Sequence, residues 1–335
     1  MNVITNRLKG RNKSIILFFS LLCILVLSII ISVGIGSVKI PIETVVKSIF
    51  NTNPDELTNS IVINMRLPRA LLAVMIGMSL GTAGALLQAV MKNPLADPGI
   101  IGVSTGASCA AIFVMLLFPT LMKYVPAFAF AGGVVAVALV YALSWKNGIS
   151  PVHIVLSGVA VNAVFGAVVS ILSILNSDKI QGVLVWMNGS LASKGWATVI
   201  QLSPYLVIGL IAALFCISGC NILQLGDEAA ASLGTKVTRT RVLISLCGAF
   251  LAGITVSFVG VIGFVGLVVP HITRILVGSD YKRMLPCTML MGGTVLLIAD
   301  TLSRTLFAPI ELPVGSIMAL AGGPFFLYLL RKSKR

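Results

Sequence analysis

The chain has 335 residues, of which 57% are apolar and only 10% are charged. This composition cannot supply the polar surface of a water-soluble protein of this length, so it excludes a soluble globular domain and indicates a bilayer protein. The formal net charge of +14 could suggest a nucleic-acid partner, but the basic residues are scattered among apolar segments rather than gathered on one face, so we expect no nucleic acid.

The first predicted membrane-spanning helix covers residues 14–36. Four basic residues between positions 7 and 13 precede it, as in a secretory signal. The apolar run is too long for a signal, however, and no small-x-small cleavage pattern follows it. We therefore expect a retained helix whose amino end lies in the cytoplasm.

Residues 37–65 form the longest polar stretch of the chain. Pro41 and Pro54 interrupt it, and the apolar residues between positions 42 and 49 have a helical spacing. We interpret this stretch as an outer surface segment.

The second spanning helix is expected from about Arg69 to Met91. It carries Gly77, Gly81 and Gly84, and small residues at such a spacing let two helix backbones approach closely in lipid. Gly102 and Gly106 repeat the pattern in the third span. Between the two spans, the prolines within residues 92–99 predict a compact inner loop.

Seven further segments complete a bundle of about ten spans, and an outer helix is expected between Asn176 and Thr198. The remaining expected spans are residues 125–144, 152–175, 204–220, 242–259, 262–277, 285–302 and 314–330. Pro270, His271 and Arg274 predict that the eighth span is short or kinked, which lipid permits only where neighbours satisfy the freed carbonyls. The fold class is all-α, a polytopic membrane protein, and residues 1–335 are expected to form a single transmembrane domain.

Topology explains the basic residues. With both termini inside and ten spans, the inner segments hold sixteen of the 24 lysines and arginines. That excess on the inner side is what the positive-inside rule requires. These sixteen residues are Arg7, Lys9, Arg11, Lys13, Lys92, Lys146, Lys236, Arg239, Arg241, Arg274, Lys282, Arg283, Arg331, Lys332, Lys334 and Arg335.

No metal or catalytic site is expected. The six cysteines lie within or beside apolar helices, and Cys216 and Cys220 have no histidine or carboxylate nearby, so we expect them to pack as small apolar residues. His271 stands alone after Pro270 and is expected to form a hydrogen bond at the kink. Two distant histidines and sparse carboxylates predict no intramembrane enzyme.

The energy source distinguishes two classes of transporter. The nucleotide-binding motif GxxxxGK[ST] is absent, so either an ion gradient drives the chain or a separate ATPase docks on it. Ion-coupled carriers place ionisable groups at mid-membrane. Here the nearest candidates are Asp300 and Arg304, whose spacing of four favours an intrahelical ion pair.

The loop 221–241 favours a docked ATPase. Asp227 and Glu228 favour the amino end of a short helix, three alanines propagate it, and Gly234 can close it in a left-handed conformation. Such a smooth helix suits the groove of another protein, although spacing alone does not exclude a simple surface helix. The following Lys236, Arg239 and Arg241 would pair with partner acids or with lipid phosphates.

Several motifs resemble those of the iron–siderophore and cobalamin permease family of ABC importers. Glu228-Ala229-Ala230 with Gly234 is similar to the element by which ABC importer permeases contact their ATPase. More specific are Arg66-Leu67-Pro68-Arg69, Gly84-Ala85-Leu86-Leu87-Gln88, the run Asn93 to Gly99, the run Gly263 to Arg274, and Glu311-Leu312-Pro313-Val314-Gly315. The resemblance extends in order from about Arg66 to the last helix.

The resemblance implies a type II importer permease fold and several partners. These are a second permease subunit (an identical copy or a paralogue), two cytoplasmic ATPases, an extracytoplasmic substrate-binding lipoprotein and membrane lipid. The chain would itself bind no cofactor and hydrolyse no ATP, which the partner ATPase would use. The expected cargo is an iron(III)–siderophore complex carried across the bacterial cytoplasmic membrane, with haem and cobalamin as alternatives.

The resemblance also assigns roles to particular residues. Arg66, Arg69 and Arg304 match arginines that receive acidic residues of the binding protein, and guanidinium groups suit carboxylates. The alternative is that Arg66 and Arg69 anchor the interface and that Arg304 pairs with Asp300. The remaining assignments are an ATPase-docking element of Asp227, Glu228, Ala229, Ala230, Ala231, Ser232, Leu233 and Gly234, and a cytoplasmic gate of Asn93, Leu95, Ser150 and Pro151. Pro151 replaces the small hydroxyl residue expected there.

Overall fold

The computed structural model describes residues 2–36, 38–50, 52, 55–145 and 149–333. Within these ranges the chain forms helices and turns, with a single isolated bridge between Trp145 and Ile149. The α-helices are α1 (Asn2–Gly34), α2 (Ile42–Ile49), α3 (Glu56–Ser60), α4 (Leu67–Met91), α5 (Val103–Leu117), α6 (Val125–Ser144), α7 (Pro151–Leu175), α8 (Ile180–Met187), α9 (Trp196–Phe215), α10 (Ile217–Gln224), α11 (Asp227–Ser232), α12 (Val237–Val259), α13 (Val265–Val277), α14 (Tyr281–Ser303) and α15 (Val314–Ser333). The π-helical turn η1 (Ile61–Arg66) and the 3₁₀ helices η2 (Pro98–Ile101), η3 (Pro119–Tyr124) and η4 (Ser177–Lys179) connect them.

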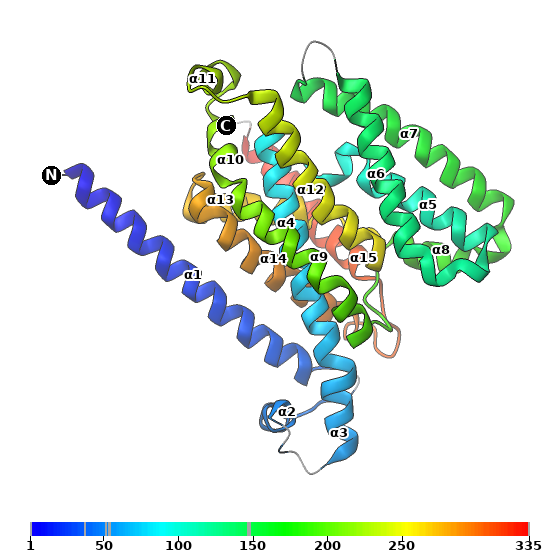
Figure 1. Cartoon of the computed structure of the whole chain (residues 1–335). Helices are drawn as coiled ribbons and strands as arrows, with labels where there is room; N and C mark the ends of the chain where they lie inside the picture. The colour runs from blue at the N-terminus through cyan, green and yellow to red at the C-terminus, as the bar shows by residue number, and fades with distance from the viewer. Residues whose placement is uncertain (1, 37, 51, 53–54, 146–148, 334–335) are drawn as a thin grey trace.

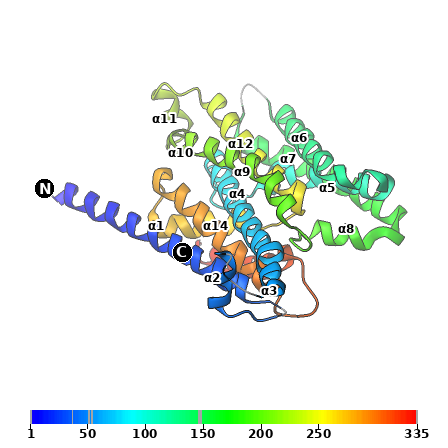
Figure 2. The same cartoon turned by 60° about the horizontal axis from the view of Figure 1, so that its bottom comes forward.

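Helix α4 forms the centre of the bundle. Its most apolar window, within residues 56–91, is 83% buried inside the protein, against 22% for the window of α7. It packs against α12, α13 and α14, and α1 lies on one flank while α5, α6, α7 and α8 form a group on the other (Figure 1). A second view keeps this division, with α1 and α8 at opposite sides (Figure 2). An apolar helix that is buried all round is expected only at such a centre.

Ten apolar helices occupy the ten predicted spans in the described part of the chain. Seven of them are long and apolar enough to cross a membrane, and three are shorter, at 103–117, 265–277 and 314–328. The sixth span was placed too late in the sequence. Helix α9 begins at Trp196, and the bundle continues from it into α10 after Cys216. Trp196 is therefore the first residue of α9 rather than part of an outer helix. Its indole N–H donates to the carbonyl of Ile63 at 2.8 Å.

Close approach of backbones explains the glycines of α4. A Cβ added at Gly84 would lie 1.9 Å from the carbonyl oxygen of Gly266, and one at Gly77 would lie 2.2 Å from that of Gly292. The predicted tight packing of these two positions is therefore confirmed. Gly102 has another role, because its φ of +81° is a left-handed conformation that favours glycine.

A polar side chain of α4 satisfies the carbonyl that Pro270 leaves free in α13, as lipid requires. Pro270 has no N–H to donate to the carbonyl of Gly266, four residues earlier. That carbonyl accepts instead from the Gln88 side-chain amide at 3.3 Å, and Arg274 holds Gln88 by a hydrogen bond of 2.9 Å. The predicted short, neighbour-supported helix is confirmed. The predicted hydrogen bond of His271 is not found, since its Nδ1 has no partner among the described residues.

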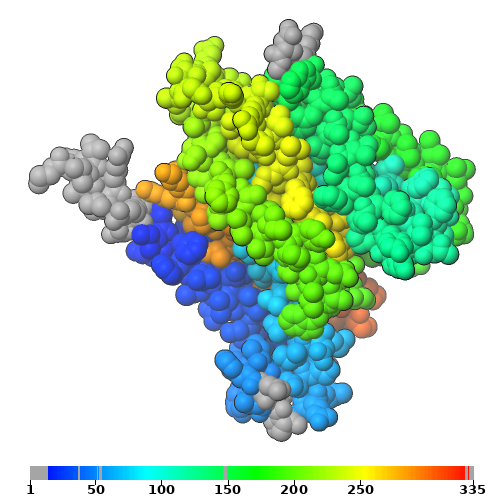
Figure 3. Space-filling model, in the orientation of Figure 1, coloured from blue at the N-terminus to red at the C-terminus, as the bar shows by residue number. Residues whose placement is uncertain are grey.

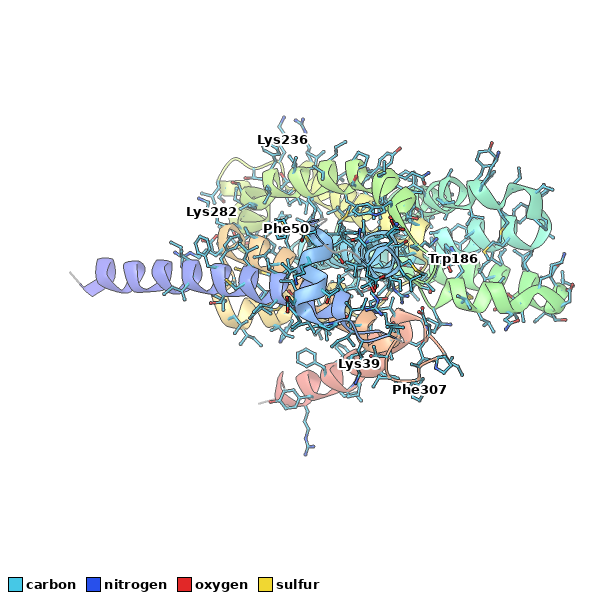
Figure 4. The ribbon with its side chains drawn as sticks, turned by 90° about the horizontal axis from the view of Figure 1, so that it is seen from below. Lys39, Phe50, Trp186, Lys236, Lys282 and Phe307 are labelled. Carbon is cyan, nitrogen blue, oxygen red and sulfur yellow. The ribbon has the colours of Figure 1, made fainter. Side chains whose placement is uncertain are left out.

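The bundle has two ends that differ in character. We call the end with α11 and the turns at 92–97 and 149–150 the α11 end, and the opposite end with α2 and α3 the α2 end. Both α11 and the α2–α3 segment stand out from the surface in Figure 3. Seen from the α2 end, Phe50 lies near the middle of the view and Trp186 lies toward the α5–α8 group (Figure 4).

Candidate functional site

Helix α11 is a single capped turn of chain at the tip of the α11 end. Gly226 begins it with φ +105°, and Gly234 follows it with φ +78°. The N–H of Gly234 donates to the carbonyl of Ala231, and that of Thr235 donates to the carbonyl of Ala230. These two bonds form a Schellman motif. The left-handed closure predicted at Gly234 is therefore confirmed.

The two faces of α11 are unlike. Ala230 is completely buried against the bundle, whereas the other residues of 227–234 are exposed. Leu233 exposes 65% of its surface and adds an apolar side chain to the exposed face. The surface available to a partner therefore consists of Glu228, Ala229, Ala231 and Leu233 rather than Ala230.

Asp227 holds this helix to the bundle through two cations. Its Oδ1 accepts hydrogen bonds from the Lys92 ammonium at 2.5 Å and from Arg241 at 2.8 Å. Partial burial opposes ionisation, but the bonds from Lys92 and Arg241 outweigh it and hold the pKa of Asp227 below its ordinary value. The expectation that Arg241 pairs with partner acids or lipid phosphates is wrong, because its side chain is buried.

The four predicted gate residues lie in two turns at the α11 end. The Asn93 side chain accepts from the N–H of Leu95 at 2.9 Å, which closes the turn after α4. Ser150 caps α7 by accepting from the N–H of His153, and Pro151 occupies the first helical position. A proline is favoured there because its missing N–H would have no helical partner. The proline at position 151, where the resemblance implies a small hydroxyl residue, thus has a local structural reason.

At the α2 end, two of the predicted docking arginines cap α1. Arg66 is 7% exposed and donates to the carbonyls of Val33, Gly34 and Val38. Arg304 is similarly buried and donates to both the carbonyl and the hydroxyl of Ser32. Carbonyls in the last turn of a helix have no intrahelical partner, and positive charge is favoured beside them.

The third arginine joins α4 to α14 and to the segment before α15. Arg69 forms two contacts of 3.0 and 2.9 Å to the two oxygens of Asp300 and one of 2.8 Å to Glu311. Asp300 is 1% exposed. Its expected intrahelical partner, Arg304, lies only at the 4.0 Å limit of an ion pair. Arg69 is therefore the main partner of this carboxylate, which the spacing within α14 did not indicate.

A cavity of about 700 Å³ brings the three arginines together at the α2 end. Lys194 and Glu311 also line it, and sequence reasoning assigned neither of them a role. The remaining lining residues are Gly36, Val38, Ile61, Asn64, Met65, Ala192, Ser193, Gly195, Ala308 and Pro309. The cavity therefore offers an opening with several cations and one acid.

No metal site is seen in the ranges that the structure describes, since no three His, Cys, Asp or Glu side chains there converge on a point. Cys216 and Cys220 are free thiols, and Cys220 is buried.

Known proteins resemble the chain over nearly its whole length. The model described as the FecCD transport family matches residues 24–332. The Fe(3+)-citrate import system permease protein YfmE of Bacillus subtilis is 38% identical over 328 residues, covering 98% of each chain. The hemin transport system permease protein HmuU of Yersinia pestis is 37% identical over 334 residues, also covering 98% of each.

A solved structure has the same architecture. It is described as an inward-facing conformation of a metal-chelate type ABC transporter, and it is 31% identical in sequence. The TM-score is 0.84, over 94% of this chain and 98% of the other. The helical arrangement described above is thus that of a transporter chain.

Proposed function

The chain belongs to the FecCD transport family, and from that premise we propose that it is the permease subunit of an ATP-driven importer of iron(III)–siderophore complexes in a bacterial cell membrane. The relatives carry names for Fe(3+)-citrate, hemin and iron(3+)-hydroxamate import. These cargoes share one property, a bulky organic chelate around iron. Haem or cobalamin remains the alternative cargo within the family.

The two ends of the bundle would meet different partners. In this proposal the α11 end and both termini lie in the cytoplasm, where α11 docks on one of two ATPase subunits that hydrolyse the ATP. The α2 end faces outward and receives the substrate-binding lipoprotein. A second permease subunit completes the pathway, and Asn93, Leu95, Ser150 and Pro151 form its inner gate. This assignment is supported by the basic residues of the inner loops.

The main support for the proposal is the capped, mostly exposed helix α11. A helix closed by a Schellman motif keeps its shape, and its small exposed side chains can enter a groove with little loss of side-chain entropy. Ala230 packs on the bundle and Asp227 is paired with Lys92 and Arg241, so the other exposed residues of 228–234 are available to contact another protein.

Ala229→Arg tests the docking role. A bulky charge on the exposed face should reduce ATPase co-purification and ATP-driven uptake by at least about tenfold, as substitutions at the centre of an interface do. Ala229→Ser keeps the face small and serves as the control at the same site. Ala230 is unsuitable, because its burial means that substitution would disturb the fold of α11 itself. Unchanged ATPase association in Ala229→Arg would refute docking through α11.

Binding-protein docking rests on the cavity at the α2 end. Arg69 is 12% exposed there, with its guanidinium already oriented by Asp300 and Glu311. Arg69→Lys retains the charge but loses the fork that carboxylates bind in two places. We expect weaker binding-protein affinity in a pull-down titration, with a thermal unfolding curve as the parallel check on stability. Full affinity in a stable Arg69→Lys protein would contradict the role.

Cargo is identified by competition. Radioiron-labelled ferric hydroxamate should be taken up when the cognate binding protein is present. Unlabelled ferric hydroxamate should compete with this uptake, whereas ferric citrate, haemin and cobalamin should not. Uptake that an uncoupler abolishes while ATP is maintained would instead indicate an ion-coupled carrier. Against that class stands Asp300, whose carboxylate is already held by Arg69.

A further inference from the structure

The proposed docking helix α11 is connected to both proposed gate turns, and the connection starts at the Asp227 carboxylate. Oδ1 of Asp227, in the first turn of α11, accepts both from Lys92 and from Arg241. Lys92 directly precedes the gate residue Asn93. The docking helix and the turn after α4 are therefore joined by an ion pair of 2.5 Å.

Arg241 extends this connection to the second gate turn. Its other terminal nitrogen donates to the carbonyl of Ile149 at 2.5 Å, and Ile149 directly precedes the gate residue Ser150. Only 2% of the Arg241 side chain is exposed, and Ile149 is also buried. The guanidinium is planar and rigid, so a displacement of one partner is transmitted to the other.

The buried guanidinium depends on both partners. Removing a charge from water is costly unless it is paired and hydrogen-bonded. Arg241 Nε has no hydrogen-bond partner in the described residues, so Asp227 and Ile149 supply the compensation found there. A movement that broke one contact would leave the charge poorly compensated, and Arg241 is therefore expected to move together with both.

Helix α11 is a compact unit between two glycines. Gly226 and Gly234 flank it in left-handed conformations, and a Cβ at either position would meet nothing within 4 Å. Within the ranges described, the ion pairs of residues 227–234 all involve Asp227. Asp227 therefore provides the polar attachment of α11 to the bundle, alongside the buried Ala230.

We propose that Asp227, Lys92 and Arg241 form a relay that converts movement of α11 into movement of both inner-gate turns. The relay rests on the proposed docking of α11 on an ATPase. Arg241 is its central positioning residue: it contacts no cargo, but it links the docking helix to the turn before α7. Lys92 links the same carboxylate to the turn after α4.

The test measures coupling rather than activity alone. The complete transporter, with its ATPase and binding protein, is reconstituted in proteoliposomes supplied with radioiron-labelled ferric chelate. We expect Arg241→Gln and Asp227→Asn each to lower the iron imported per ATP hydrolysed by about tenfold. ATPase co-purification with Arg241→Gln, which changes a residue outside the docking helix, should stay within about twofold of wild type. The double variant, with Asp227→Asn and Arg241→Gln together, should lose no more coupling than either single variant, because each substitution breaks the same contact between Asp227 and Arg241.

Two further variants separate coupling from stability. Arg239→Gln, on the same helix but with an exposed side chain, is the matched control and should retain wild-type coupling. Arg241→Lys keeps the charge, but a single ammonium cannot hold both partners in the geometry of the guanidinium, so an intermediate loss is expected. If Arg241→Gln does not fold, Arg241→Lys and Asp227→Asn carry the test, because Asp227 is half-exposed.

Three outcomes would overturn the relay. They are wild-type coupling in both Asp227→Asn and Arg241→Lys, additive losses in the double variant, and loss of ATPase binding in parallel with coupling, which would make Arg241 a structural support of α11 only. A wild-type complex that hydrolyses ATP and imports none of the ferric chelates would instead contradict the proposed function.

Discussion

The two ends of the bundle use the same kinds of charged residues in opposite ways. At the α2 end, Arg66 and Arg304 are buried and donate to backbone carbonyls, and the partly buried Arg69 is held by the buried Asp300. At the α11 end, the half-exposed Asp227 holds two cations from separate segments. A buried network with several contacts per charge is rigid. The attachment at the α11 end is mixed, because Asp227 is half-exposed while its partner Arg241 is 2% exposed. The comparison indicates a fixed arginine cluster at the α2 end and, at the α11 end, a helix joined to the bundle through one acid.

The largest expected effect comes from removing Asp300. Asp300→Ala would leave Arg69 and Arg304 buried without their shared anion, which should cost about 3–5 kcal/mol of folding stability. Glu43 also forms an ion pair, with Lys47, but both side chains are exposed, so Glu43→Ala should cost far less stability than Asp300→Ala. Denaturation of the purified protein in detergent measures both. Equal stabilities of the two variants would show that the arginines at the α2 end do not form a rigid network.

A smaller effect is expected for Arg66. Arg66→Ala would remove donors from the carbonyls of Val33 and Gly34, and hydrogen bonds to charged groups contribute about 1.5–3 kcal/mol. The loss should be local, so hydrogen exchange of the amides in the last turn of α1 should accelerate while that of α4 is unchanged. Protection of α1 equal to wild type would contradict the capping role.

The smallest effect concerns pH at the α11 end. A carboxylate whose pKa is lowered by its partners stabilises the attached state above its ordinary pKa, and this stabilisation is lost as pH falls through the lowered value. For Asp227 the loss therefore begins near the ordinary value of 3.8 and is completed below it. A spin label at Leu233 should become more mobile over that range in wild type. In Asp227→Asn it should be mobile at every pH, and a pH-independent label in wild type would argue against the tether.

The local features of the chain were readable from the sequence. The apolar runs predicted the ten apolar helices, Pro270 predicted the short α13, and Gly234 predicted the closure of α11. Each depends on residues within one or two helical turns. Boundaries were harder to predict: the sixth span was placed too late, because Trp196 was assigned to the outer segment before it, whereas it is the first residue of α9.

The partners of the charged residues could not be read from the sequence. Arg241 was expected to face a partner or lipid, and Asp300 was expected to pair with Arg304 four residues away. Arg69 reaches Asp300 across 231 positions, and Lys92 reaches Asp227 across 135. No local spacing encodes such a pair.

Hydropathy and turn chemistry therefore determined by themselves that this chain is a helical membrane protein, with a capped helix projecting from one loop. The family motifs added its kinship to importer permeases. Only the tertiary structure decided which partner each charged residue has and how deeply it is buried. The physical reason is that helix formation depends on near neighbours, whereas the stability of a buried charge depends on whichever distant helix brings it a counter-charge or a carbonyl.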